Sequence, residues 1–60
     1  MKSKEIVKKA QNVLPGEHYL GLVILEVEVS IKMVTLILPN GRYEFFHLDE
    51  EVTVGVLVKL

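Results

Sequence analysis

Hydrophobic residues near the start of the chain follow the spacing of an amphipathic helix. One helical face would carry the apolar residues Ile6, Val7, Ala10, Val13 and Leu14. The polar residues between them fall on the opposite face, as in a helix that covers a core. Ser3 can cap the first turn, and Pro15-Gly16 would end the helix because proline cannot continue it. The pattern therefore predicts a helix over residues 4–14.

Beyond residue 17 the hydrophobic period shortens to that of β-strands. Apolar residues alternate with polar ones, or run continuously, over residues 18–29, 33–38, 42–48 and 52–60. Each of these segments is predicted to be a strand. Gly21, inside the first of them, is interpreted as a bulge or a close backbone approach. Ser30-Ile31-Lys32 is the expected first turn, and Asp49-Glu50-Glu51 is the last.

The hairpin between the second and third predicted strands turns at Pro39-Asn40-Gly41. A two-residue loop would place Pro39 at a ladder position that needs an N–H group. A loop of three residues avoids this conflict, with Pro39 and Asn40 in a type I turn and Gly41 in the left-handed region. Thr35 then lies opposite Phe45. In either register both hairpin faces carry large apolar groups, because Phe45 and its neighbour Phe46 point to opposite sides.

Together these elements predict an α+β fold in a single domain over residues 1–60. The N-terminal helix would be followed by a curved antiparallel β-meander of three to four strands, which can close into a small barrel-like sheet. One short helix cannot cover two apolar sheet faces, so the second face must meet the far wall of a barrel or another subunit. We therefore expect a homo-oligomer, with a dimer favoured. The candidate interface residues are Leu36, Ile37, Tyr43, Phe45 and Phe46.

The stretch from Val34 to Val56, VTLILPNGRYEFFHLDEEVTVGV, resembles the opening hairpin of ubiquitin-like β-grasp domains. Those domains often have a strand, a turn with proline and glycine, a second strand, and a polar turn leading to a helix. The resemblance covers less than half of the chain and consists of a hairpin alone. It implies one alternative, in which Thr53 caps a short helix over residues 53–60. Valine and glycine are poor helix formers, so a strand is preferred there.

Composition limits how so small a domain can be stabilised. The chain has 60 residues, half of them hydrophobic, and no cysteine. Disulfides and thiolate metal sites are therefore excluded. No secretory signal is visible, and the uncharged runs are far shorter than the roughly 20 apolar residues that span a bilayer. We expect a cytoplasmic protein without a membrane partner.

The charges suggest two functional classes. The formal net charge is −1, and the expected N-terminal helix is basic whereas the remainder is acidic. We expect a small non-catalytic interaction or assembly module that self-associates, or binds a protein partner, through an apolar sheet face. The alternative is a small nucleic-acid-binding regulatory protein, with the hairpin aromatics stacking on bases. Its phosphate contacts would be Lys4, Lys8, Lys9 and Arg42, although the acidic sheet opposes phosphate binding.

Few residues suggest catalytic or metal chemistry. His18 and His47, with Glu17 or Asp49, could bind a metal, and the acidic turn could hold a hard cation. These signals are generic, and the spacing of a calcium-binding loop is absent, so ordinary surface residues are favoured. The chain also has no phosphate-binding glycine loop and no dinucleotide-binding motif. We therefore expect neither an enzyme nor a cofactor or metal site.

Overall fold

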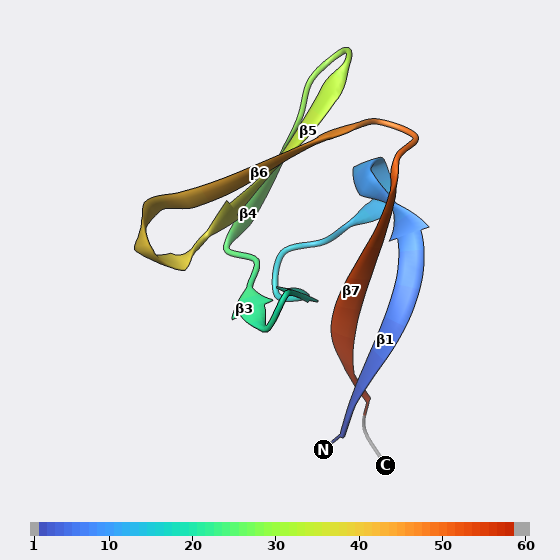
Figure 1. The fold of residues 1–60 in the computed structure, drawn as a ribbon, viewed down its shortest axis with the longest axis vertical. Helices are drawn as coiled ribbons and strands as arrows, with labels where there is room; N and C mark the ends of the chain where they lie inside the picture. Colours follow the sequence, from blue (N-terminus) through green and yellow to red (C-terminus); the bar gives the residue numbers. More distant parts are fainter. Residues whose placement is uncertain (1, 59–60) are drawn as a thin grey trace.

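The structure, a computed structural model that describes residues 2–58, consists mainly of antiparallel β-strands (Figure 1). The strands are β1 (Lys2–Lys9), β2 (His18–Tyr19), β3 (Leu22–Val23), β4 (Glu26–Val29), β5 (Met33–Leu38), β6 (Arg42–His47) and β7 (Glu51–Val58). Two 3-10 turns, η1 (Ala10–Asn12) and η2 (Pro39–Gly41), are the helical elements of this described part. The predicted α+β class is therefore wrong.

The strands form two sheets. The sheet that we call the terminal sheet has the order β1-β7-β2-β3, and the sheet that we call the meander sheet has the order β4-β5-β6. β1 and β7 pair from Lys2↔Val58 to Lys9↔Glu51, so the two ends of the chain run side by side (Figure 1). The meander sheet lies across from this pair, and the chain enters β7 directly from β6.

The predicted N-terminal helix is replaced by a strand. In β1, Ile6 lies opposite the buried Val54, whereas the adjacent Val7 is 60% exposed, which is the alternation of a strand. A helix of this length is marginal in water, because nucleation is costly. Pairing with β7 instead satisfies the backbone groups along one edge of the segment, and it gives β7 a neighbour along its whole length. The long-range partner therefore overrides the local helical spacing.

The predicted strand 18–29 is also interrupted. Leu20 (φ 50°) and Gly21 (φ 81°) form a tight turn between β2 and β3, so Gly21 marks a turn rather than a bulge. The chain then changes sheets: the Ile24 N–H donates to the Glu17 carbonyl (2.7 Å), and the next N–H, of Leu25, donates to the Ile37 carbonyl (2.8 Å). The continuous apolar run in the first half of this segment is compatible with the crossing between sheets, because a segment that is covered on both faces needs apolar residues on both faces.

The β5–β6 hairpin has the expected register, with Leu38 opposite Arg42 and Thr35 opposite Phe45. Its turn differs from the prediction, because Asn40 has φ 64° and ψ 29° and so joins Gly41 in the left-handed region. Asparagine tolerates that region better than most residues. β5 has the expected bounds. The helical alternative for residues 53–60 is wrong for the described part, which is a strand up to Val58, and residues 59 and 60 lie outside the described range.

The hydrophobic core lies between the two sheets. Its buried residues are Ala10, Val13, Ile24, Val34, Leu36, Leu38, Val52 and Val54. They come from β5, from β7, from η1 and the loop after it, and from the link between β3 and β4. One face of each sheet is thus covered by the other sheet, and the opposite faces point outward.

Candidate functional site

The outward face of the meander sheet carries a cluster of large apolar side chains. We call the set of Met33, Ile37, Tyr43 and Phe45 the aromatic face. Ile37 lies opposite Tyr43, and Thr35 lies opposite Phe45. Paired residues of an antiparallel ladder share one face, so these side chains are neighbours. Tyr43 is 54% exposed, Phe45 60% and Met33 39%, so the group presents a contiguous apolar surface to solvent.

The surroundings of the aromatic face are partly acidic. On β4, Glu26 lies opposite Ile37 and Glu28 lies opposite Thr35, and both carboxylates are exposed. At the β4–β5 turn Ile31 is 88% exposed. This turn is ordered by Ser30, whose hydroxyl accepts the Met33 N–H at 3.1 Å. Beside it lies a shallow depression of about 770 Å³. Its lining residues are Ser30, Ile31, Lys32, Met33, Thr35 and Phe45.

The residues expected at the subunit interface lie on different faces of the meander sheet. Ile37, Tyr43 and Phe45 lie on the aromatic face, whereas Leu36 is fully buried in the core. Phe46 also faces inward, and its ring meets that of Tyr19 edge to face, with centroids 5.6 Å apart. Sequence reasoning missed Met33 as a surface residue, although its alternation with Thr35 and Ile37 contained the signal.

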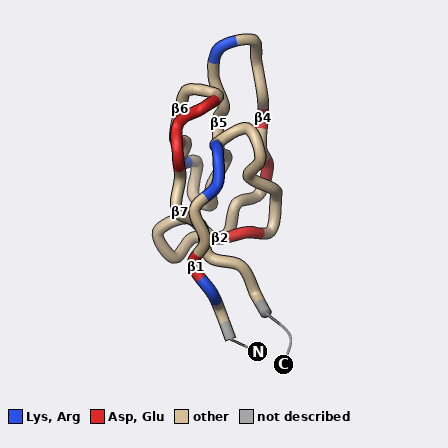
Figure 2. The backbone as a smooth tube through the Cα atoms, turned by 90° about the vertical axis from the view of Figure 1, so that its right-hand side faces the viewer, with Lys and Arg blue, Asp and Glu red and all other residues tan. Residues whose placement is uncertain are grey.

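The residues expected to contact phosphates do not form one basic surface. Lys4, Lys8 and Lys9 belong to β1 of the terminal sheet, whereas Arg42 begins β6 of the meander sheet. The basic helix that would have grouped the lysines is absent, and basic and acidic residues are distributed over both sheets (Figure 2). The lysines are thus separated by strand topology from the exposed aromatic rings.

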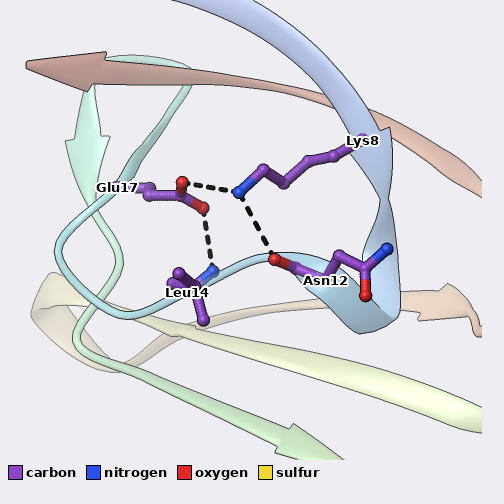
Figure 3. Close-up of polar contacts among 4 residues, drawn as sticks. All are labelled: Lys8, Asn12, Leu14 and Glu17. Atoms are coloured by element: carbon purple, nitrogen blue, oxygen red, sulfur yellow. Dashed lines mark hydrogen bonds and ion pairs between the residues drawn. The ribbon is translucent and has the colours of Figure 1, made fainter. Parts of the chain in front are cut away.

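Two of these lysines already have acidic partners. The Lys8 ammonium lies 2.7 Å from a Glu17 carboxylate oxygen, and the other oxygen of Glu17 accepts the Leu14 N–H at 2.8 Å (Figure 3). Lys8 also donates to the Asn12 carbonyl at 3.3 Å. Both charged side chains are largely covered, at 20% and 12% exposure. This network holds the connecting loop against β1. Lys9 lies 3.8 Å from Asp49 in a more exposed pair.

The two histidines lie on different sheets, and only His47 adjoins the acidic turn. His18 belongs to the terminal sheet and His47 to the meander sheet. Within residues 2–58 no group of three histidine or acidic side chains is arranged to hold a metal ion. In the acidic turn, Glu50 accepts the His47 N–H at 3.2 Å, and Asp49 accepts a hydrogen bond from the Gln11 amide at 3.2 Å. These carboxylates therefore organise the turn.

No protein family, curated protein or solved structure matches this chain. Across residues 2–58, neither helical turn is long or apolar enough to cross a membrane.

Proposed function

We propose that the protein is a small non-catalytic interaction module that associates with a second copy of itself through the aromatic face. The observation that carries this proposal is the exposure of Tyr43 and Phe45 side by side on a regular sheet. Since a buried aromatic side chain covers about 150 to 250 Å², the two rings leave on the order of 200 Å² in water. A partner that covers the two rings would remove this apolar area from water, which is favourable relative to the isolated chain.

The expected affinity follows from the size of this surface. Two copies would bury on the order of 400 Å² of ring surface, which corresponds to about 10 kcal/mol at 25 cal/mol per Å². Association costs roughly 4 to 15 kcal/mol, so the gain and the cost are similar. A three-stranded face also offers less than the roughly 800 Å² per partner of a standard interface. We therefore expect weak self-association: a surplus of about 4 to 5 kcal/mol would give a dissociation constant of about 0.2 to 1 mM.

A second copy suits this face for two reasons. The face is a regular antiparallel sheet, and two such sheets pack on each other with their strands about 30° apart. The formal net charge is only −1, so two copies repel each other weakly. Glu26 and Glu28 lie on the outer strand β4, where they can stay hydrated at the rim of the contact.

The nucleic-acid alternative receives less support. A stacking platform for bases needs cations beside the rings to neutralise phosphates. Here Glu26 and Glu28 flank the aromatic face, whereas Lys4, Lys8 and Lys9 lie on the other sheet. Binding of a fluorescent oligothymidine at low salt would nevertheless favour this class, particularly if the Phe45→Ser variant lost it.

Analytical ultracentrifugation tests the proposal. The wild-type protein should contain dimers at about 1 mM and become monomeric on dilution to about 10 µM. Phe45→Ser should raise the dissociation constant at least about tenfold, since losing 1.4 kcal/mol suffices for that change. Val7→Ser is the matched control, because Val7 is also 60% exposed but lies on the outward face of the terminal sheet. A wild-type monomer at the highest concentration, or equal weakening by Val7→Ser, would contradict the proposal.

A further inference from the structure

The outward face of the terminal sheet contains a row of three paired positions whose middle residue has no side chain. Gly55 on β7 lies opposite Glu5 on β1 and, on its other side, opposite His18 on β2. Neighbouring strands are about 4.8 Å apart, so Glu5 and His18 stand about 10 Å apart across the glycine. A carboxylate and an imidazole therefore flank a gap whose floor is backbone.

This gap is part of a hollow of about 620 Å³ that opens to solvent. Besides the row itself, it is lined by Ser3, Leu20, Gly21, Thr53 and Leu57. Leu57 lies opposite Ser3 in the neighbouring row, so an apolar wall adjoins the polar centre. The floor depends on Gly55, because a Cβ added there would lie 3.6 Å from the Cβ of His18 and occupy the gap at ordinary contact distance.

The turn at the rim of the hollow contains a residue whose backbone conformation is unfavourable. Leu20 has φ 50° and is 79% exposed. A leucine in the left-handed region is strained, and the exposed side chain gains no burial in compensation. Asparagine would suit the position better, as it does in tight hairpins of this kind. The leucine is therefore costly for the fold, while it places an aliphatic side chain beside the hollow.

We propose that this hollow binds an alkylammonium group, which is an aliphatic chain ending in a protonated amine. The ammonium would lie above Gly55, donating to the Glu5 carboxylate, to the hydroxyl groups of Ser3 and Thr53 or to the imidazole of His18. The aliphatic stem would lie along Leu20 and Leu57. Among the side chains that the structure describes, Glu5 has no cationic partner in an ion pair, so its charge is available to a ligand.

The chemistry of the lining selects this ligand class. An anion would face the Glu5 carboxylate, and a purely apolar group would leave that carboxylate and the two hydroxyl groups poorly hydrated. A charge-assisted hydrogen bond to a carboxylate is about twice as strong as a neutral one. The same group occurs on free aliphatic amines and on lysine side chains of peptides, so both are included in the test. The site is independent of the aromatic face, which belongs to the other sheet.

Titration of the full chain with n-pentylammonium, followed by NMR amide shifts, tests the site. Saturable shifts are expected at Glu5, His18, Leu20, Gly21 and Gly55. Pentan-1-ol has the same stem without the charge and should bind at least fivefold more weakly. Glu5→Gln should weaken pentylammonium binding at least fivefold, whereas Glu26→Gln, an exposed carboxylate on β4, should leave it unchanged. Gly55→Val should abolish binding by filling the floor, and its amide spectrum reports whether the fold is retained.

The remaining outcomes assign the source or overturn the proposal. Tighter binding of N-acetyl-lysine methylamide than of pentylammonium would indicate a lysine side chain as the ligand, and the reverse order would indicate a free amine. Equal affinity for pentylammonium and pentanol would overturn the site, as would equal weakening by Glu5→Gln and Glu26→Gln. Should Gly55→Val not fold, the two glutamate variants decide the question alone.

Discussion

The two faces of the meander sheet are built from alternating residues of the same strands, yet only one is covered. On the inner face Val34, Leu36 and Leu38 are at most 3% exposed. On the outer face Tyr43 and Phe45 remain more than half exposed. Both faces are strongly apolar, so hydrophobicity alone does not decide which one forms the core. The terminal sheet packs on one side only, so the other side remains exposed to solvent.

The largest contrast should come from neighbouring residues of β5. Leu36→Ala should lower the free energy of unfolding by about 2 to 5 kcal/mol, because it leaves a cavity in the core. Ile37→Ala, on the outer face, should cost less than about 1.5 kcal/mol, since its side chain is only half-buried in the monomer. Urea unfolding at low protein concentration measures both. A similar loss of unfolding free energy in the two variants would contradict the assignment of Leu36 to the buried face and Ile37 to the outer face.

The adjacent phenylalanines of β6 should differ in the same way. Phe46→Ala should destabilise the protein by about 3 kcal/mol, because it removes core packing and the edge-to-face contact with Tyr19. Phe45→Ala should change the stability of the monomer by less than about 1 kcal/mol while weakening self-association. Unfolding curves at low and high protein concentration separate these effects. If Phe45→Ala proved the more damaging at low concentration, the inward assignment of Phe46 would fail.

Among the polar groups, covered pairs should matter more than exposed ones. Lys8→Met should cost about 1 to 2 kcal/mol, because it leaves the largely covered Glu17 carboxylate without its ion-pair partner. Lys9→Met removes the more exposed contact with Asp49 and should cost at most about 0.5 kcal/mol. Thermal unfolding of the two variants provides the comparison. Equal effects would show that the Lys8–Glu17 contact contributes no more than a surface pair.

One further effect has the opposite sign and concerns the terminal sheet. Leu20→Asn should raise the free energy of unfolding by about 1 kcal/mol, because asparagine relieves the strain of the left-handed turn. The same variant should weaken alkylammonium binding by removing the apolar rim. Gly21 provides the control, since Gly21→Ala at φ 81° should destabilise the turn. A lower stability of Leu20→Asn would show that the leucine makes contacts that favour the fold.

The sequence predicted the meander better than the segments around it. The missing N–H of Pro39, a local constraint, favoured the β5–β6 register that the structure has, although the sequence left the alternative register open. The pattern predicted that both faces of the hairpin are apolar, but it did not decide which of the two is exposed. The hollow of the terminal sheet was not foreseen, because it joins Glu5, His18 and Gly55 from three separate segments. Likewise, Gly21 was the only sequence feature that indicated the positive φ angles of Leu20 and Gly21, and it was interpreted as a bulge or a close backbone approach rather than as a turn.

By itself, the sequence determined the alternation of β5 and β6 and the presence of large apolar residues on both sides, and it favoured the observed register of their hairpin over the alternative. Only the tertiary structure decided that residues 2–9 are a strand, since their local spacing carries no information about the distant strand β7 that pairs with them. It also decided that Phe46 enters the core and Phe45 faces outward. The reason is physical: local sequence sets which side chains share a face, whereas the distant strands that pack on that face determine whether it is covered.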